Sequence, residues 1–269
     1  MTDGSLKMGE IHFDRLHYRH FTVSWMPASI YSYIQKWWMN KLICELKKLA
    51  KFVVLTHEDA AFWPELSNVI VIPNPTSFFP DTVSDCTYKQ VIAAGRYVDQ
   101  KGFDRLISAW QKIADKHSDW ILKIYGDGWL REQLQKQIVE LNLQGKCFLE
   151  HSVPDIASKF QESSIFVLSS RFEGFGLVIV EAMSCGLPVV SFACHCGPRD
   201  IISEGGDGFL VSEGDIDGLA TKIDWLIEDN ELRKKMGKMA RVKAEKYRIE
   251  EIGAQWIALF ESLYKSESK

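Results

Sequence analysis

From Gln90 onward, short apolar runs typical of buried strands alternate with helix-length segments, and this alternation constrains the fold more than any other feature. The runs fall at residues 91–95, 120–126, 147–149, 165–168, 187–192 and 208–211. Strands separated by helices are joined by right-handed crossovers, which produce a mostly parallel sheet covered on both faces. The pattern therefore predicts an α/β chain with a doubly wound, Rossmann-like domain that binds ligands beyond the carboxyl ends of its strands.

The segments on either side of this alternation predict a smaller first unit and a helical tail. Before residue 78 we expect a strand end at 11–13, a helix over 31–51, strands at 52–56 and 69–72, and a helix over 57–66 with Thr56 as its N-cap. Residues 76–89 have turn composition and predict a linker. Helices are expected over 215–228, 231–247 and 249–264. We therefore predict a reduced N-terminal α/β piece, residues 1–77, and a larger unit, residues 78–269.

Composition is that of an ordinary globular chain. Of the 269 residues, 46% are hydrophobic and 25% are charged, and no run of eighteen apolar residues exists that predicts a transmembrane helix. The N-terminus lacks the apolar core of a secretory signal. Six cysteines in a chain of this length do not predict a disulfide framework. A cytoplasmic location with reduced thiols is therefore the default expectation.

The net charge of −4 conceals a basic N-terminal segment, because residues 1–51 contain eight Lys and Arg against four Asp and Glu. Such a segment faces an anionic partner, for example a membrane surface or a phosphate-bearing substrate, or it is simply a solvated helix face. Within it, the apolar stripe of the helix over 31–51 contains Trp38, and Trp37 and several lysines flank that stripe. This composition suits a helix lying on a bilayer surface, although core packing is the commoner explanation.

Two groups of residues follow the first two strands of the predicted sheet. Gly95-Arg96 precedes Lys101-Gly102 at the start of a helix, and two cations at a helix N-terminus suit a diphosphate. The alternative is a surface pair without a ligand. Gly126-Asp127-Gly128 follows the next strand, where glycines allow backbone to approach a ligand closely. This second signal is weak, since the same tripeptide forms ordinary turns.

The most informative stretch follows the strand at 165–168, where Glu173 and Glu181 are separated by seven residues. Glu173 lies in a glycine-bearing loop and Glu181 within an apolar helix, where a carboxylate requires a strong partner. The free N–H groups at the helix start, near Phe175-Gly176-Leu177, suit an anion. We interpret the stretch as a phosphate site flanked by hydroxyl-binding carboxylates. The alternatives are that Glu173 only stabilises the helix dipole and that Glu181 pairs with a buried Arg or Lys in the core.

Several other chemistries are excluded or disfavoured. Cys194-His195-Cys196 suggests zinc, but the ligand types are adjacent rather than spaced as Cys-x-x-Cys, so we expect no metal site. The P-loop motif, the Gly-x-Gly-x-x-Gly fingerprint at Gly95 and the Gly-x-Ser-x-Gly motif are all absent. The second half is acidic and has no basic-aromatic clusters, so nucleic acid is not an expected partner.

Taken in order, these motifs resemble a known family over residues 52–264. The resemblance is to the retaining, nucleotide-sugar-dependent glycosyltransferases of the GT-B fold in the glycosyl transferases group 1 family (family four). The motifs that carry it are Ile72-Pro73-Asn74-Pro75, Gly95-Arg96 with Lys101-Gly102-Phe103, Gly126-Asp127-Gly128, Glu173-x7-Glu181, Gly186-Leu187-Pro188-Val189, and Gly197-Pro198-Arg199-Asp200-Ile201-Ile202 before Gly208-Phe209-Leu210-Val211.

The resemblance implies a donor site for a UDP-sugar or GDP-sugar, with no metal and no other cofactor. It implies that Arg96 and Lys101 neutralise the diphosphate, that Glu181 binds the ribose hydroxyls and that Glu173 contacts the transferred sugar. Glu173, Arg96 and Lys101 are thus the implied catalytic residues. The remaining implied donor-binding residues lie at strand ends and at the helix start: Gly95, Gly126, Asp127, Phe175, Gly176 and Leu177, with the loop after Glu150.

The N-terminal half departs from the family pattern. The family has a full N-terminal Rossmann domain for the acceptor, whereas about 75 residues without a glycine-rich loop precede the linker here. We therefore expect the apolar face of the last helix to be partly exposed: Ile252, Trp256, Leu259, Phe260 and Leu263.

The resemblance implies two candidate functions. The first is transfer, with retention, of a hexose or N-acetylhexosamine to a glycan or lipid-linked acceptor in surface polysaccharide biosynthesis, by a protein peripheral to the inner face of the membrane. The second is a non-catalytic nucleotide-sugar-binding subunit that needs a partner chain, or an inactive truncated transferase. A sugar-nucleotide epimerase is disfavoured by the order of the motifs.

Overall fold

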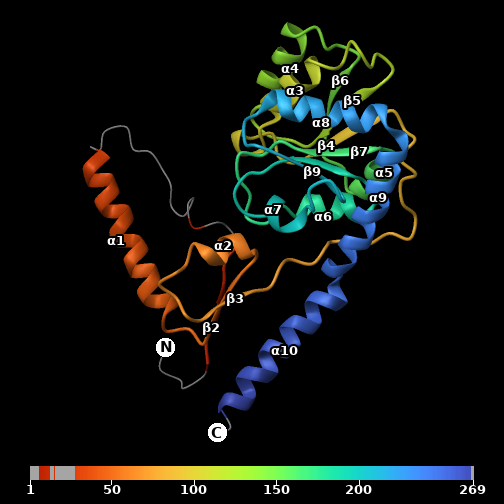
Figure 1. Ribbon diagram of the computed structural model, residues 1–269. Coiled ribbons are helices and arrows are strands. Elements are labelled where there is room, and N and C mark those ends of the chain that lie inside the picture. The colour runs from red at the N-terminus through yellow and green to blue at the C-terminus, as the bar shows by residue number, and fades with distance from the viewer. Residues whose placement is uncertain (1–5, 13–14, 16–27, 268–269) are drawn as a thin grey trace.

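The computed structural model describes residues 6–12, 15 and 28–267, and it contains two parallel sheets (Figure 1). A six-stranded sheet forms the larger unit, and a three-stranded sheet forms the smaller one. The α/β class and the doubly wound parallel sheet expected from the sequence are therefore confirmed. All six cysteines lie in the described part, and none of them forms a disulfide.

The larger sheet has the strand order β6-β5-β4-β7-β8-β9, and every neighbouring pair is parallel. Its strands are β4 (Gln90–Ala94), β5 (Ile121–Tyr125), β6 (Cys147–Glu150), β7 (Ile165–Leu168), β8 (Val189–Phe192) and β9 (Gly208–Val211). The chain runs outward from β4 to β6 and then returns to β7 on the other side of β4. The order therefore reverses between β4 and β7, and such a switch point opens a crevice at the carboxyl ends of the strands.

Helices cover both faces of this sheet (Figure 1). On one face lie α3 (Phe103–Gln111), α4 (Arg131–Glu140) and α8 (Ile216–Glu228), whose buried side chains share one apolar cluster with the strands. On the other lie α5 (Ile156–Gln161), α6 (Leu177–Ser184) and α7 (Pro198–Ile201), and α9 (Asn230–Ala244) packs against α6. Because both faces are covered, the inner strands β4, β7 and β8 are buried over almost their whole length, as the sequence pattern indicated.

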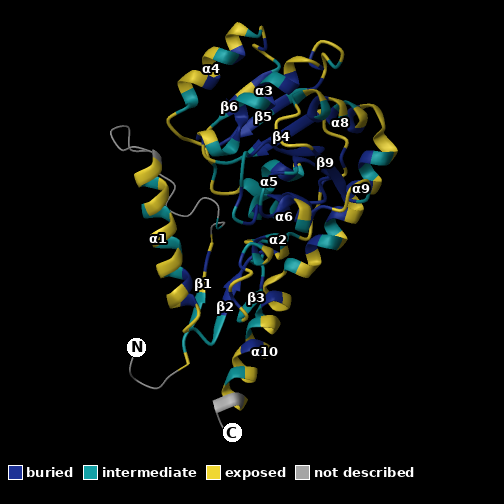
Figure 2. Cartoon of the chain, turned by 60° about the vertical axis from the view of Figure 1, so that its left-hand side comes forward, coloured by how far each residue is buried: buried dark blue, intermediate teal, exposed yellow. Residues whose placement is uncertain are grey.

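The smaller sheet has the order β1-β2-β3 and is also parallel. Its elements are β1 (Met8–Glu10), α1 (Ala28–Leu46), β2 (Lys51–Val54), α2 (His57–Ala61) and β3 (Val69–Val71). The core of this unit centres on Phe52 and Trp63, whose rings meet edge to face at 5.1 Å. Only the C-terminal half of α1 packs on this core, and Figure 2 shows exposed residues along most of that helix.

The last helix, α10 (Ile249–Glu267), leaves the larger unit through a short 3-10 turn, η3 (Glu245–Tyr247), and packs on the smaller sheet (Figure 1). Ile252 and Leu259 are buried against Val53 and Ile72. Phe260 is 52% exposed and stacks on Trp256. The expected partial exposure of this face is thus found at Phe260, whereas the small sheet covers Ile252 and Leu259.

Several element boundaries differ from the sequence predictions. The helix expected over 57–66 ends at Ala61, because Pro64 disfavours helical geometry at the residue before it. Thr56 caps this helix as predicted, its hydroxyl accepting the Asp59 N–H at 3.0 Å. The helix expected over 231–247 ends at Ala244 and is followed by η3.

Two predictions near the N-terminus are also shifted. The helix expected over 31–51 runs from Ala28 to Leu46, and Lys51 begins β2 instead. The strand end expected at 11–13 is displaced to Met8–Glu10, with the Ile11 N–H adding one bond to the Val53 carbonyl. Phe13 lies outside the described residues.

Candidate functional site

A recess lies at the carboxyl ends of β4 and β5, beside the start of α6. It consists of two adjoining hollows of about 390 and 330 Å³ that share Ala94, Gly95 and Ile156. The larger is lined further by Lys101, Glu173, Leu177, Val178 and Glu181. The smaller is lined further by Arg96, Tyr125, Gly126, Asp127, Ser152 and Val153. The recess therefore lies at the topological switch point where the fold predicts a ligand.

Eight of the ten donor-site residues expected from the sequence line this recess: Gly95, Arg96, Lys101, Gly126, Asp127, Glu173, Leu177 and Glu181. They come from four segments separated by up to 86 positions in the chain. The loop after Glu150 also reaches the recess, through Ser152 and Val153. Phe175 and Gly176 do not line it. Phe175 is buried and its ring lies 5.8 Å from that of Tyr247, in a separate hollow between the two units.

Lys101 and Glu173 form an ion pair at the base of the recess. The Lys101 Nζ donates to Glu173 Oε1 at 2.7 Å, and the Ser170 hydroxyl donates to the same oxygen at 2.6 Å. Both side chains are largely buried, at 15% and 7% exposed. An ammonium has three donors, so Lys101 retains further N–H groups for an anion while it orients Glu173. From the sequence these two residues are expected to have separate roles, and no motif indicates that they pair.

Glu181 lies on α6 with its carboxylate at the recess. The Ser77 hydroxyl donates to its Oε1, and among the described residues no Lys, Arg or His forms an ion pair with it. Burial raises the pKa of Glu181 above its ordinary value, because desolvation penalises the charged form. The alternative of a core carboxylate paired with a buried Arg or Lys is therefore wrong. What remains is a half-buried carboxylate with acceptor capacity directed at a hollow.

Ser77 was missed by sequence reasoning, because residues 76–89 read only as a linker. The same holds for the apolar lining side chains Val153, Ile156 and Val178, which carry no chemical signal. Only the tertiary structure brings them to the recess.

Arg96 and Asp127 lie at the outer part of the recess and are both exposed. Asp127 accepts the Ser152 N–H at 3.0 Å and lies 2.6 Å from His151 Nδ1. Bonds from Ser152 and His151 hold the pKa of Asp127 well below its usual range. Asp127 therefore fixes the position of the loop after β6 through hydrogen bonds. Arg96 is an exposed cation beside the recess.

The close approach of the β4 end leaves no room for a side chain at Gly126. A Cβ at this position would lie 1.9 Å from the Gly95 carbonyl oxygen, so a side chain would push apart the ends of β4 and β5. The interpretation from sequence, that this glycine admits a ligand, is thus supplemented by a constraint from the neighbouring strand.

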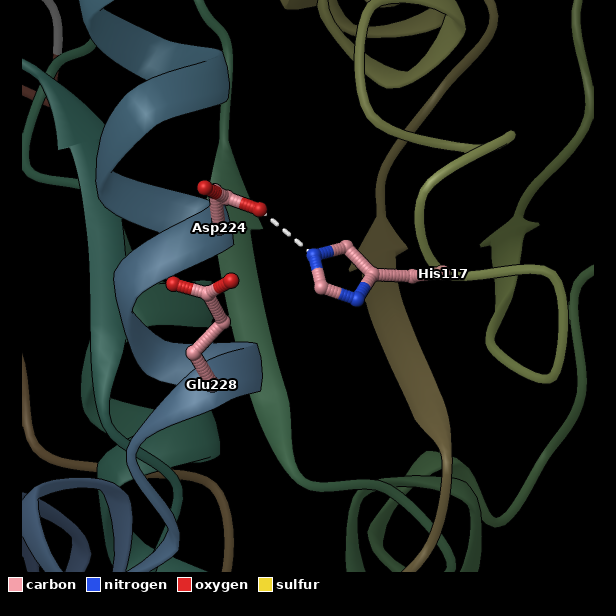
Figure 3. Close-up of side chains that lie close together, drawn as sticks. All are labelled: His117, Asp224 and Glu228. Atoms are coloured by element: carbon pink, nitrogen blue, oxygen red, sulfur yellow. Dashed lines mark hydrogen bonds and ion pairs between the residues drawn. The ribbon is translucent and has the colours of Figure 1, made fainter.

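Two groups of residues contain side chains of the types that bind metal ions. Cys194 is a buried thiol whose pKa is raised by desolvation, and Cys196 is likewise buried. In the described part of the chain, the only group with suitable geometry is that of His117, Asp224 and Glu228 (Figure 3). Lys116 lies 2.8 Å from Asp224 and 2.6 Å from Glu228, so a lysine ammonium already supplies the cation. This cluster joins the segment after α3 to α8 and lies outside the recess.

With this geometry established, comparison with known proteins identifies the family. The family model described as "Glycosyl transferases group 1" matches residues 76–243. An uncharacterized glycosyltransferase from Haemophilus influenzae is 33% identical over 210 residues, which are 77% of this chain and 60% of that protein. A poly(ribitol-phosphate) alpha-N-acetylglucosaminyltransferase from Staphylococcus aureus is 31% identical over 73% of this chain and 39% of its own length.

The fold is also shared with solved structures. A Staphylococcus aureus TarM variant, crystallised with fondaparinux, alpha-GlcNAc-glycerol and UDP, superposes with a TM-score of 0.78 at 28% identity, covering 95% of this chain and 50% of that one. This chain therefore spans only part of the length of the relatives it matches. Because the family model matches well over half of its residues, the chain belongs to the glycosyl transferases group 1 family, whose members have the GT-B fold.

Proposed function

We propose that this chain binds a nucleoside-diphosphate sugar in the recess and transfers its hexose or N-acetylhexosamine, with retention, to a glycan or lipid-linked acceptor in surface polysaccharide biosynthesis. The observation that carries the proposal is the pair of carboxylates at the recess. Glu181 has acceptor capacity but no cationic partner among the described residues, and Glu173 is held by Lys101. Carboxylates that accept hydrogen bonds match the hydroxyl groups of a ribose and of a sugar ring.

The charges along the recess support one orientation of the donor. Its ribose hydroxyls donate to Glu181, and a hydroxyl of the transferred sugar donates to Glu173. Its diphosphate lies between these ends, near Lys101, Arg96 and the N-terminus of α6, whose first N–H groups have no acceptor within the helix. This arrangement uses both hollows of the recess.

In the proposed reaction the bond between the sugar C1 and the diphosphate oxygen breaks, and the electron pair leaves with the nucleoside diphosphate. The acceptor hydroxyl oxygen forms the new bond to C1 on the same face, and its proton passes to the departing diphosphate. Lys101 and Arg96 stabilise the charge that develops on the leaving group, which is electrostatic catalysis by groups already in position.

The relatives support the chemical class. The name of the poly(ribitol-phosphate) alpha-N-acetylglucosaminyltransferase specifies an N-acetylhexosamine and a polymer acceptor, and the TarM structure contains UDP. We therefore expect UDP or GDP as the leaving group. The direct test is release of nucleoside diphosphate from UDP-N-acetylglucosamine, UDP-glucose and GDP-mannose, with and without a polymer acceptor. Enzyme-dependent release from none of these donors would contradict transferase activity.

A second candidate is a nucleotide-sugar-binding subunit without turnover of its own. The observation that favours it is the small N-terminal sheet, which has three strands among the described residues. This candidate predicts that the chain binds a donor yet releases no nucleoside diphosphate until a partner chain is added. Binding and turnover measured on one preparation separate the two.

Arg96 is expected to contribute to nucleotide affinity through the diphosphate alone. Replacing Arg96 by Ala should weaken binding of UDP or GDP about tenfold, because a hydrogen bond to a charged group contributes roughly 1.5–3 kcal/mol and this one is partly screened. Binding of the uncharged nucleosides uridine and guanosine should change less than about twofold, since Arg96 faces phosphate only. Calorimetry measures both ligands. Lys136→Ala, a charge removal on the exposed surface of α4, is the control, and equal losses for nucleotide and nucleoside would refute the phosphate role.

The exposed side of α1 is proposed as a contact with an anionic lipid surface. Ile30, Tyr33 and Trp37 are 51%, 73% and 53% exposed, and they lie on one side of the helix with Lys41, whose Nζ is 5.5 Å from the Trp37 ring. Aromatic rings beside lysines suit the boundary between lipid headgroups and acyl chains. Within the described residues, no helix is long and apolar enough to cross a bilayer.

The membrane prediction is tested by flotation with phosphatidylcholine vesicles, with and without phosphatidylglycerol. The double variant Trp37→Ser with Lys41→Glu should lose about tenfold or more of the binding to anionic vesicles, since each basic residue near such a surface contributes about 1 kcal/mol. Trp225→Ser, an exposed tryptophan on α8, is the matched control. Unchanged flotation of the double variant would exclude α1 as the contact.

A further inference from the structure

Where α2 meets α7, the smaller unit and the larger unit each supply a carboxylate that accepts hydrogen bonds from the other. Asp200 of α7 accepts the backbone N–H groups of His57 and Glu58 at 3.2 Å each, at the start of α2. In return, Glu58 accepts the Cys196 N–H at 3.0 Å and pairs with Arg199 at 2.6 Å. The Glu58 side chain is 19% exposed, whereas the side chain of its partner Arg199 is 47% exposed. The two units are therefore joined by charged hydrogen bonds in both directions, and we call the contacts of Glu58 and Asp200 the clasp.

The loop held by Glu58 packs against the segment that carries Glu173. The Glu173 N–H donates to the His195 carbonyl at 3.1 Å, and Phe172 forms a parallel bridge with His195. Gly197 follows with a φ of 125°, and a Cβ there would lie 1.8 Å from the Phe175 carbonyl oxygen. Residues 195–197 thus lie in close backbone contact with residues 172–175, so a shift of one segment moves the other.

We infer that Glu58, with Asp200, is a positioning residue that sets Glu173 against the transferred sugar from the neighbouring unit. The inference rests on the proposed function, since it assigns the sugar end of the donor to Glu173. Glu58 does not line the recess, so it acts through the segment 195–199 that it contacts. The smaller unit is then a structural part of the donor site.

This role predicts an effect on one end of the donor only. Glu181 lies on α6, where its carboxylate accepts from Ser77 rather than from a residue of the clasp, and Arg96 follows β4. Replacing Glu58 by Ala should therefore weaken binding of a nucleotide sugar about tenfold, since a displaced Glu173 loses its hydrogen bond to the sugar hydroxyl. Binding of the corresponding free nucleoside diphosphate, which lacks this hydroxyl, should stay within about twofold. A merely structural role would weaken both ligands together.

The experiment is calorimetry with three ligand pairs: UDP with UDP-N-acetylglucosamine, UDP with UDP-glucose, and GDP with GDP-mannose. Glu58→Gln keeps an acceptor for the Cys196 N–H while it removes the charge that pairs with Arg199, so it should recover part of the loss. Glu65→Ala is the matched control, because Glu65 pairs with Arg15 within the smaller unit, at 2.7 Å. Thermal melts of each variant verify folding at the titration temperature.

The outcomes separate the two claims. A selective loss of nucleotide-sugar affinity in Glu58→Ala, partly rescued in Glu58→Gln, supports the positioning role. Equal losses for both ligands, or no loss for either, would overturn it even though the wild-type chain binds the donor. If the wild-type chain binds none of the five ligands, the proposed function itself fails.

Discussion

Replacement of Lys101 by Met is expected to lower the free energy of unfolding by about 3 kcal/mol and to weaken binding of UDP or GDP by about 100-fold. Two separate causes act. The ion pair with Glu173 is largely buried, and removal of one partner leaves an uncompensated carboxylate in the core of the site. The hydrogen bond from Ser170 to Glu173 limits the loss of stability to the lower end of the usual range. The affinity falls because the diphosphate loses its most buried cation.

A double variant separates these causes. In Lys101→Met with Glu173→Gln no unpaired charge remains, so most of the stability should return while nucleotide affinity stays low. Lys89→Met is the control, because Lys89 pairs with Asp119 at an exposed position where little stability is at stake. Chemical denaturation and calorimetry are the measurements. If Lys101→Met is as stable as the wild type, the pair does not form in solution. If it binds nucleotide normally, Lys101 has no role at the diphosphate.

Replacement of Glu181 by Ala should weaken nucleotide binding by about 10- to 100-fold, because hydrogen bonds from ribose hydroxyls to a carboxylate contribute roughly 1.5–3 kcal/mol. Unlike Lys101→Met, this change removes a carboxylate that has no cationic partner in the described structure, so it should not destabilise the fold as an ion-pair loss does. Nucleotides that lack the ribose 2′-hydroxyl serve as a control for the ribose contact. The wild-type chain should bind 2′-deoxy-UDP or 2′-deoxy-GDP more weakly than the ribonucleotide, and Glu181→Ala should lose most of this discrimination. Retained discrimination in the variant would show that another group binds the ribose.

Glu181 also predicts a pH dependence of stability. Its pKa is raised in the folded state, so the native protein binds the proton more readily than the unfolded chain does. Ionisation of Glu181 therefore costs stability as the pH rises from the unfolded pKa through the raised folded pKa, and this cost is absent below the unfolded pKa. Glu181→Gln should melt at a higher temperature than the wild type at pH 7.5, and the difference should shrink toward pH 4. A difference that is constant with pH would contradict the desolvation of this carboxylate.

Much of the larger unit was predictable from the sequence, because its signals are local. Apolar runs such as Ile165–Leu168 are too short and too branched for helices, and their alternation with helices fixes a parallel sheet. Parallel strands present their carboxyl ends at one edge, which is why Gly95, Gly126 and Glu173 meet there although they are distant in sequence.

The parts that sequence could not predict depend on contacts between distant segments. The pairing of Lys101 with Glu173 requires the relative position of β4 and β7, and no spacing rule contains it. Ser77 beside Glu181 comes from a segment with only turn composition. The apolar face of α10 was correctly identified, but its partner is the smaller sheet, whose three short strands carry little periodicity.

We propose that the recess between the ends of β4 and β5 and the start of α6 binds a nucleoside-diphosphate sugar. The decisive measurement is calorimetric titration of the wild-type chain and of Glu181→Ala with UDP and GDP. We expect saturable binding of one nucleotide per chain for at least one of the two, with a marked loss of affinity in Glu181→Ala. Absence of binding to both nucleotides, or equal affinity of the wild type and the variant, would contradict it.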